Sequence, residues 1–391
     1  MTPERVLLVH NAYQHAGGED GVVAAELALL RGKGHEVVEL RRDNDAIGGM
    51  GRLSLAAQTL WSGATHAQAL ALLRQHRPAV VHVHNTLPLV SPSLYWACAK
   101  AGVPVVQTLH NFRLACPQAM FLRDGKVCER CLGHAPWPAV VHGCYRESRA
   151  QTAVVAGMLM LHRGLRTFEQ KVTRYIALNE FCRAKFIQAG LPAQRVAVKP
   201  NFADMARAPD GQARQGFLFV GRLSAEKGVE TLGRAWQAGS GMQLRVIGTG
   251  PEAARLDAQA RVEMLGAKTP AQVQAEMHTA LALVLPSICY ENFPRTLVEA
   301  FACGLPVIAS RIGALAELVE DGQTGLLFEP GDAQDLSRVL RWAQAHPAEM
   351  AVMGANARAR YEAHYTPDIN YTQLRAIYRA AIDDTPCETP T

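Results

Sequence analysis

The sequence predicts an α/β protein built from two doubly wound parallel-sheet domains that face one another across a cleft. In both halves of the chain, short uninterrupted apolar runs alternate with helical segments, which is typical of strands buried on both faces of a parallel sheet. A polar stretch without periodicity separates the halves at residues 201–216. The length of 391 residues is sufficient for two such domains, each with its own core.

The first domain, residues 1–200, opens with a strand, a glycine loop, a helix and a second strand. Val6–Val9 form the first apolar run, and a helix is expected from about Asp20 to Arg31. Between them, Gly17 and Gly18 allow close approach of a ligand to the backbone. A glycine pair is equally typical of an ordinary tight turn between a strand and a helix, so both interpretations stay open.

Two later strands of this domain carry histidines near their ends. His82 and His84 alternate with valines in AVVHVHN, where histidines that are buried and hydrogen-bonded are the more frequent case. His110 and Asn111 close the next apolar run, VPVVQTLHN, at the strand end where α/β sheets collect their ligand sites. His110 is therefore a candidate site residue.

Four cysteines fall in an insertion at residues 116–144 that otherwise resembles a long loop: Cys116, Cys128, Cys131 and Cys144. Such a loop needs something to hold it together. Disulfides do not persist in a reducing cytosol, whereas a CxxC pair with two further thiols can bind tetrahedral zinc. We predict a structural zinc held by all four, with another metal or free thiols as the alternatives. His134 and His142 are reserve ligands.

The second domain, residues 217–365, begins with the strand FLFV and the loop GRLSAEKG. Arg222 and Lys227 in this loop can donate charge-assisted hydrogen bonds to phosphate, worth about 1.5–3 kcal/mol each. Such bonds strengthen as charge builds on a departing diphosphate, which is where catalysis gains. These two cations can therefore replace a divalent metal, and we expect no catalytic metal or cofactor.

The segment LPSICYENFPRTLVEAFACGLPVIAS predicts a strand end, a loop, a helix that begins at about Pro294, and a further strand. Glu291 lies in the loop, and Glu299 lies about 7.5 Å further along the helix axis than Pro294. Unpaired N–H groups near Arg295 and Thr296 form an anion site between the two carboxylates. The arrangement suits a nucleotide-sugar, which has a diphosphate flanked by hydroxyl-bearing groups.

Together with FLFVGRLSAEKGVETL, the spacing of Glu291 and Glu299 resembles the signature of family-4 retaining glycosyltransferases. The resemblance covers nearly the whole chain and implies a GT-B fold, in which the helix of residues 366–391 crosses back to the first domain. It implies that Glu291 contacts the donor sugar, that Glu299 contacts the ribose and that His110 contacts the donor sugar. The family usually has Asp after this His, and Asn111 leaves a general-base role there in doubt. The residues so implied are His110, Glu291, Arg222 and Lys227 for catalysis, and Gly17, Gly18, Arg222, Lys227, Glu291, Phe293, Pro294, Arg295, Thr296 and Glu299 for donor binding.

The function that this resemblance implies is hexosyl transfer with retention, without a catalytic metal. The donor would be a nucleotide diphosphate-sugar, and the acceptor a glycan or a polyprenyl-diphosphate-linked glycan of cell-surface polysaccharide or lipopolysaccharide biosynthesis. The alternative is an NAD-dependent dehydrogenase or nucleotide-sugar epimerase, because Gly248, Gly250 and Ala253 match a dinucleotide fingerprint. That motif follows the second strand of its domain, and Glu263 comes sooner than the roughly 20 residues the fingerprint expects.

Charge and hydropathy bear on partners and location. Residues 1–200 carry a net charge of +10 and residues 201–391 one of −5, which suggests that the first domain meets something anionic. No basic recognition motif or aromatic RNA-binding signature appears, so nucleic acid is not expected. Residues 146–174 combine basic side chains with an apolar belt, which favours an anionic membrane surface. The apolar runs are too short to cross a bilayer, and we expect a cytoplasmic protein, peripheral on the inner face of the plasma membrane.

Overall fold

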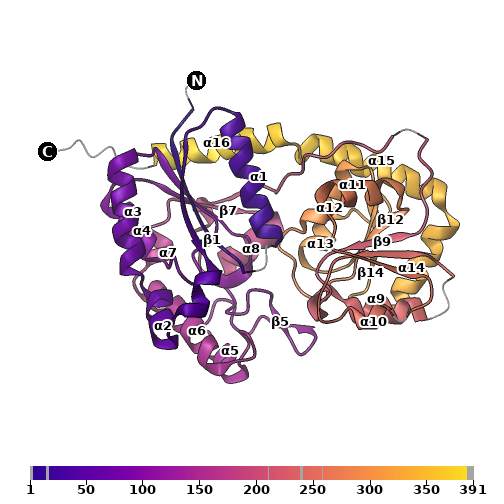
Figure 1. Ribbon diagram of the computed structural model, residues 1–391, viewed down its shortest axis with the longest axis horizontal. Helices are drawn as coiled ribbons and strands as arrows, with labels where there is room; N and C mark the ends of the chain where they lie inside the picture. The colour runs from indigo at the N-terminus through magenta and orange to yellow at the C-terminus, as the bar shows by residue number, and fades with distance from the viewer. Residues whose placement is uncertain (1–2, 15–16, 210, 238–240, 258, 385–391) are drawn as a thin grey trace. The chain divides into compact units, whose positions relative to one another are not determined.

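The computed structural model describes residues 3–14, 17–209, 211–237, 241–257 and 259–384 (Figure 1). The chain divides into two compact units. Unit 1 comprises residues 1–119, 129–200 and 370–391, and unit 2 comprises residues 120–128 and 201–369. Each unit contains a six-stranded sheet in which all pairings are parallel, which confirms the predicted α/β architecture.

The sheet of unit 1 has the strand order β2-β1-β3-β4-β7-β8. Its strands are β1 (Val6–Ala12), β2 (Val37–Asp43), β3 (Val80–Val83), β4 (Val105–Thr108), β7 (Arg174–Ala177) and β8 (Val196–Val198). Strands β1, β3 and β4 are buried along their whole length, as the uninterrupted apolar runs require. Chain order changes direction between β1 and β3, and such a switch point is where open α/β sheets bind ligands.

The helices of unit 1 cover this sheet and carry the insertion. They are α1 (Gly18–Gly32), η1 (Asn44–Gly49), α2 (Arg52–Leu60), α3 (Gly63–His76), α4 (Ser93–Lys100), η2 (Phe112–Leu114), α5 (Trp137–His142), α6 (Arg149–Gly164), α7 (Thr167–Gln170), α8 (Glu180–Gln188) and η3 (Ala193–Arg195). Helix α1 begins two residues before the predicted Asp20, whose carboxylate accepts a hydrogen bond of 2.9 Å from the Gly17 N–H. This bond satisfies a donor at the start of the helix and fixes where it begins.

The last helix, α16 (Pro367–Asp383), contributes to the core of unit 1 (yellow in Figure 1). Leu374 and Tyr378 are fully buried in a cluster with Val6 of β1 and Val106 of β4. Apolar burial of this size ties the end of the chain to the first sheet.

Unit 2 has the strand order β11-β10-β9-β12-β13-β14. These strands are β9 (Phe217–Val220), β10 (Leu244–Ile247), β11 (Val262–Gly266), β12 (Ala282–Leu285), β13 (Val307–Ser310) and β14 (Gly325–Phe328). Its helices are η4 (Ala225–Lys227), α9 (Val229–Gln237), α10 (Ala254–Asp257), α11 (Pro270–Thr279), α12 (Arg295–Ala302), α13 (Gly313–Leu318), α14 (Ala333–Ala345) and α15 (Pro347–His364). Here the switch point lies between β9 and β12, so the loops that follow these two strands are the expected ligand loops.

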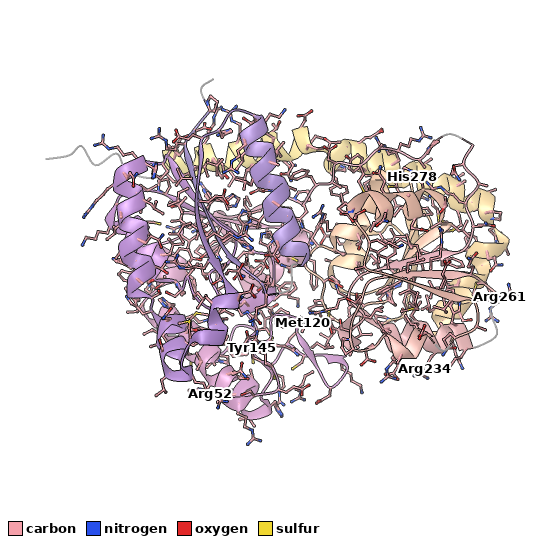
Figure 2. All side chains as sticks on the ribbon, in the orientation of Figure 1. Arg52, Met120, Tyr145, Arg234, Arg261 and His278 are labelled. Carbon is pink, nitrogen blue, oxygen red and sulfur yellow. The ribbon has the colours of Figure 1, made fainter. Side chains whose placement is uncertain are left out.

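A hairpin from the cysteine-rich insertion belongs to unit 2, whereas we expected the whole of residues 116–144 in the first domain. It begins at Met120 (Figure 2) and pairs β5 (Leu122–Arg123) with β6 (Lys126–Val127). Its two-residue turn has positive φ at both central positions, which gives the hairpin the twist of a type I′ turn. Phe121 is fully buried, and its ring meets that of Tyr290 edge to face at 5.8 Å between centroids. This contact explains why the hairpin packs with unit 2.

Candidate active site

The loops after β9 and β12 bring two predicted site residues together at the switch point of unit 2. The Nζ of Lys227 lies 2.6 Å from Oε1 of Glu291, and the Ser287 hydroxyl donates to the same oxygen at 2.6 Å. The two side chains are 29% and 14% exposed, so the ion pair is largely buried but not closed off from solvent. A substrate can therefore reach both charges.

Gly228 makes this approach possible. Its φ is +70°, and a Cβ at this position would lie 1.8 Å from the carbonyl oxygen of Pro286. Any side chain would push the two loops apart and would separate Lys227 from Glu291. The glycine that ends the string GRLSAEKG is therefore a geometric requirement of the site.

Electrostatics keep Lys227 charged. Burial alone would lower its pKa, but the Glu291 carboxylate and its hydrogen bond hold the pKa of Lys227 above its ordinary value. The ammonium group is thus a permanent cation at neutral pH, as a phosphate ligand needs to be.

Arg222 has a different partner from Lys227. Its guanidinium forms an ion pair with Glu226 and donates to the Ser224 hydroxyl at 3.2 Å, and its side chain is 65% exposed. Burial would raise the pKa of Glu226, but hydrogen bonds from Ser224 and the backbone and the Arg222 charge lower it. Glu226 therefore orients Arg222. Sequence reasoning missed this role, although the spacing of the two residues in GRLSAEKG was a signal for the pair.

Helix α12 presents the second predicted carboxylate. The helix begins at Arg295, with Pro294 as its N-cap residue, one position later than expected. Glu299 is 8% exposed, burial raises its pKa, and its carboxylate lies 2.8 Å from Nε of Arg295. Thr296 is half-buried in the first turn, whereas Phe293 is buried and its ring meets that of Tyr365. The structure thus places Phe293 in the packing of the loop.

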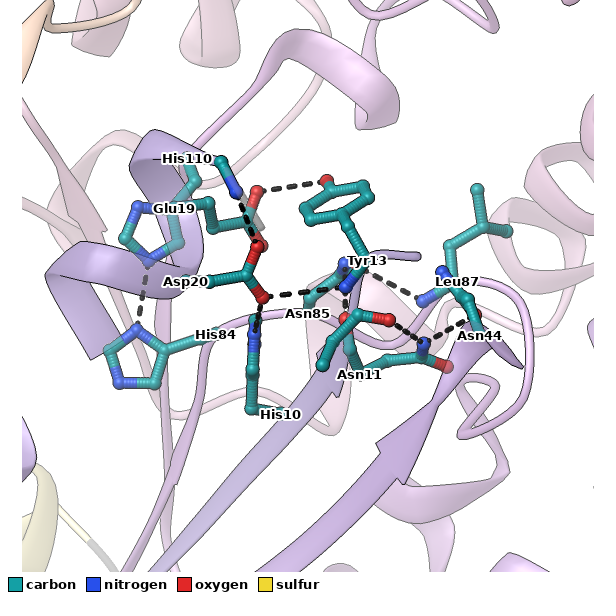
Figure 3. A network of polar contacts seen from close by, with 12 residues as sticks. His10, Asn11, Tyr13, Glu19, Asp20, Asn44, His84, Asn85, Leu87 and His110 are labelled. Carbon is teal, nitrogen blue, oxygen red and sulfur yellow. Dashed lines mark hydrogen bonds and ion pairs between the residues drawn. The ribbon is translucent and has the colours of Figure 1, made fainter. Parts of the chain in front are cut away.

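The carboxyl ends of β1, β3 and β4 carry the candidate site of unit 1 (Figure 3). His110 follows β4, and its Nε2 lies 2.8 Å from Nδ1 of the buried His84. Both line a small cavity of about 40 Å³ together with Asn111. Gly17 and Gly18 lie after β1, where predicted, but a Cβ on Gly18 would meet no atom within 4 Å. Close packing within unit 1 therefore does not require glycine at position 18.

A carboxylate that sequence reasoning missed lies beside Asn111. The Glu19 carboxylate accepts hydrogen bonds from the Tyr13 hydroxyl at 2.9 Å and from Nδ2 of Asn111 at 3.3 Å (Figure 3 labels Tyr13 and Glu19). Burial raises the pKa of Glu19 to about 7, and the charge of Asp20 adds to that shift. An acidic residue directly after the glycine pair was the available signal. The site of unit 1 therefore contains a carboxylate, from α1, where Asn111 offers none.

The structure does not support the zinc prediction for the cysteines. Cys116 and Cys131 are buried, and Cys128 and Cys144 are half-buried. A metal site needs several ligand atoms close together. Among the residues that the structure describes, one set of three His, Cys, Asp or Glu residues has its ligand atoms within 4.8 Å of one another, and it is Glu26, His82 and His84. The four sulfur atoms are not gathered in this way.

The glycines of the dinucleotide motif have a packing role. A Cβ on Gly248 would lie 1.9 Å from the carbonyl oxygen of Gly221, and one on Gly250 would lie 2.2 Å from that of Leu223. Both glycines thus let the loop after β10 lie directly against the loop of Arg222. This close backbone contact accounts for the motif without a dinucleotide.

The basic side chains expected to meet a membrane are engaged within unit 1. Arg163 donates to the carbonyl oxygens of Leu114 and His134 at 2.7 and 2.9 Å, and Arg166 pairs with Glu169. The Nζ of Lys171 lies 4.9 Å from the centroid of the Trp96 ring. No helix among the described residues combines the length and the apolar character that a membrane crossing needs. These contacts hold Arg163 against unit 1, and the expectation that this segment meets a membrane stays a prediction.

Exposed apolar side chains occur on α2, α5 and α6 and directly after α6, and α2 and α5 each pack against α6. We call this set the apolar patch: Leu53, Trp137, Val141, Leu161 and Leu165. Their exposed fractions run from 41% to 88%. Exposed arginines lie on or beside the same helices: Arg52 (Figure 2), Arg146 and Arg149.

Two family models match consecutive parts of the chain. The model "Glycosyltransferase Family 4" matches residues 21–207, and "Glycosyl transferases group 1" matches residues 207–360. Among relatives, the glycogen synthase of Mycobacterium tuberculosis is 29% identical over 79% of this chain and 70% of its own length. The D-inositol 3-phosphate glycosyltransferase of Rhodococcus opacus is 28% identical over 78% of this chain and 69% of its own. The amylovoran biosynthesis glycosyltransferase AmsK of Erwinia amylovora is 27% identical over 52% and 55%.

Solved structures share the fold. Anabaena Alr3699/HepE in complex with UDP-glucose has a TM-score of 0.69 at 18% identity, covering 96% of this chain and 100% of that one. Sucrose-phosphate synthase from Thermosynechococcus elongatus has a TM-score of 0.71 at 20% identity, covering 96% and 98%. These likenesses confirm a GT-B fold.

Proposed function

Because the chain belongs to the family-4, group 1 glycosyltransferases, we propose that it moves a sugar from a nucleotide diphosphate-sugar to a hydroxyl-bearing acceptor, with retention of the anomeric configuration. The observation that carries this proposal is the contact of Lys227 with Glu291 at the switch point of unit 2, beside the start of α12. A diphosphate is bound by a cation, and a sugar hydroxyl donates to a carboxylate, so a nucleotide-sugar needs these two charges side by side.

Each residue of unit 2 has a role in this proposal. Lys227 and Arg222 stabilise the charge that develops on the leaving diphosphate, together with the N–H groups at the start of α12. Glu291 accepts hydrogen bonds from the donor sugar. Glu299 accepts them from the ribose, once Arg295 has turned toward phosphate. The developing charge is met by fixed cations, so the reaction proceeds without a catalytic metal or cofactor.

In unit 1, His110 contacts the donor sugar, and the backbone at Gly17 and Gly18 lies against the donor. The carboxylate of Glu19 supplements Asn111. We propose that residues 1–200 bind the acceptor and residues 217–365 the donor, joined by the linker 201–216. The final helix, residues 366–391, completes the first domain; residues 385–391 lie outside the described part.

The substrate classes follow from the relatives. The solved Alr3699/HepE complexes contain UDP or UDP-glucose, which supports a nucleotide diphosphate-sugar as donor, with a hexose as the transferred group. Relatives named for glycogen, amylovoran and colanic acid synthesis support a glycan acceptor. We propose an acceptor linked to polyprenyl diphosphate, in the biosynthesis of a cell-surface polysaccharide or lipopolysaccharide.

A lipid-linked acceptor requires the enzyme to reach a membrane surface. The apolar patch and the exposed arginines beside it have the composition of an interfacial surface, in which apolar side chains enter the headgroup region and cations meet anionic lipid. We propose peripheral association with an anionic membrane on its cytoplasmic face. A structural zinc at the four cysteines remains a prediction, which elemental analysis of the purified protein would check.

A panel of ligands in thermal denaturation tests the proposed function. We expect stabilisation by one nucleoside diphosphate and its sugar, by about 2.7 kcal/mol at a hundredfold excess over Kd, and none by NADH. The stabilising nucleotide-sugar is then used in a transfer assay with lipid-linked glycans, where NMR of the product identifies the anomer. Stabilisation by NADH alone would instead favour the dehydrogenase or epimerase. The family match and the packing role of Gly248 and Gly250 speak against that alternative.

A further inference from the structure

A buried chain of polar side chains leads from an ion pair to the candidate site residue His110. The Nζ of Lys199 lies 3.0 Å from Oε2 of Glu26, and neither side chain is more than 2% exposed. The other oxygen, Oε1 of Glu26, lies 3.4 Å from Nε2 of His84. The Nδ1 of His84 lies 2.8 Å from Nε2 of His110, a contact that Figure 3 shows. The chain therefore connects a fixed charge with a half-buried ring at the site.

The charges along this chain are defined at neutral pH. Burial alone would raise the pKa of Glu26, but the charge of Lys199 and the adjacent histidines hold it well below its ordinary value. Burial lowers the pKa of His84 to about 4, and burial and His84 lower the pKa of His110 well below its ordinary value. Glu26 is thus an anion, and the two imidazoles are neutral with one N–H each.

The anion determines which nitrogen carries each proton. Nε2 of His84 lies 3.4 Å from the Glu26 carboxylate and has no hydrogen-bond partner among the described residues, so a bare Nε2 would direct its lone pair at the anion. The proton of His84 therefore lies on Nε2, and its Nδ1 is an acceptor. The contact with His110 then requires His110 to donate from Nε2, which leaves Nδ1 of His110 without a proton.

His82 faces the same carboxylate but does not contact His110 directly in this chain. Its Nδ1 lies 3.0 Å from Oε1 of Glu26 and 2.7 Å from the Tyr378 hydroxyl, and its Nε2 lies 2.8 Å from the Thr108 hydroxyl. Although Glu26, His82 and His84 are close enough to share a cation, the ammonium group of Lys199 already neutralises the carboxylate. The ion pair with Lys199 therefore balances the charge of this group.

We propose that Glu26 and His84 are positioning residues, which hold His110 in the tautomer whose Nδ1 can only accept a hydrogen bond. The proposal rests on the function proposed above, in which His110 contacts the donor sugar. An acceptor at this point selects a group that can donate. His110 thus binds a sugar hydroxyl and discriminates against a carbonyl or phosphate oxygen at the same place.

The test is nitrogen NMR of the full-length protein labelled with ¹⁵N-histidine, which distinguishes protonated from bare ring nitrogens. The His110→Asn variant identifies the His110 signals by their loss. In the wild type we expect a protonated Nε2 and a bare Nδ1. The double variant Glu26→Gln/Lys199→Met removes both charges together, so that neither is left buried alone. In it, the tautomers of His110 should become mixed, and kcat/KM for transfer should fall at least tenfold.

His162 provides an internal reference. It is buried in the same unit, and its Nε2 lies 2.9 Å from the carbonyl oxygen of Leu60, which requires a proton on Nε2. Its signals should be the same in the wild type and the double variant. A change at His110 with an unchanged His162 therefore reports loss of the positioning contacts, whereas a change at both would report general loosening and count against the proposal.

A protonated Nδ1 of His110 in the wild type overturns the proposal, as does an unchanged tautomer in a folded double variant. If the double variant does not fold, the tautomer of the wild type decides alone. The expected tautomer in a protein without transfer activity would support the positioning role while contradicting the proposed function, so the two can fail separately.

Discussion

The Nζ of Lys227 and Oε1 of Glu291 lie 2.6 Å apart, although 64 positions separate the two residues in the chain. Each charge therefore neutralises the other. In the function proposed above, the phosphate and hydroxyl groups of a donor would replace this ion pair with two charge-assisted contacts. The ion pair thus holds a cation and a carboxylate at the proposed donor site, and neither charge is buried without a partner.

We expect Lys227→Ala to lower kcat by roughly 10- to 150-fold, since one charge-assisted hydrogen bond of about 1.5–3 kcal/mol is lost as the leaving group gains charge. Steady-state kinetics with the nucleotide-sugar identified in the ligand panel measure the effect. The matched control is Arg338→Ala, which removes an exposed cation of unit 2 that pairs with Asp335 on its own helix. An unchanged kcat in the lysine variant would place the diphosphate elsewhere.

Glu19→Gln should make the protein more stable at pH 8 but not at pH 5. Burial raises the pKa of Glu19 from 4.5 to about 7 in the folded state, so the folded chain binds more protons than the unfolded chain between these values. The wild type therefore loses stability as pH rises through this window, on the order of 1–3 kcal/mol, and the neutral amide avoids that loss.

Thermal denaturation at the two pH values measures the difference. The groups that face Glu19 are Tyr13, Asp20, Asn111 and Arg113, and each is retained in the variant. Glu349→Gln is the control, because Glu349 is an exposed acid in the first turn of α15. Equal responses of the two variants to pH would show that Glu19 is not a buried titrating group.

Phe121→Ala should destabilise the loop that carries Glu291. Phe121 is fully buried against Tyr290, which precedes Glu291 directly, and truncation of a buried Phe costs about 3–5 kcal/mol. We expect a lower melting temperature and a lower kcat/KM, because the carboxylate loses its support. Val127→Ala on the same hairpin removes a side chain that is 39% exposed and should change neither value. Normal kinetics in a destabilised Phe121 variant would limit the hairpin to a role in folding.

The sequence was informative where local pattern determines structure. Apolar runs predicted both parallel sheets. Turn residues and helical spacing predicted that Glu291 lies in the loop before a helix and that Glu299 lies on that helix. Contacts between segments that are distant in the sequence could not be predicted from local pattern. The hydrogen bond of Glu19 with Asn111 joins residues 92 positions apart, and the chain from Glu26 to His110 depends on strand register.

The two expectations that the structure does not support have a common cause. Cysteine spacing and basic composition describe which residues a segment contains but not where their side chains point. In the insertion, the cysteines differ in burial, and their sulfur atoms are not gathered as zinc requires. In α6, Arg163 donates to two carbonyl oxygens of its own unit. The exposed apolar side chains, rather than this arginine, are therefore the groups that could contact a membrane.

Removing two side chains of the apolar patch should weaken binding to membranes. Trp137 and Val141 of α5 are 58% and 62% exposed, and an indole in the headgroup region contributes both apolar area and a hydrogen-bond donor. We expect Trp137→Ala/Val141→Ser to reduce partitioning onto anionic vesicles at least tenfold, which corresponds to about 1.4 kcal/mol of lost apolar transfer.

Co-sedimentation with vesicles that contain anionic lipid, or only zwitterionic lipid, measures this partitioning. Raised salt should release the wild type by screening Arg52, Arg146 and Arg149. Trp342→Ala is the control, because Trp342 is 37% exposed on α14 of the other unit and should not contribute. Equal losses in both variants, or equal binding to both vesicle types, would show that the apolar patch does not meet an anionic bilayer.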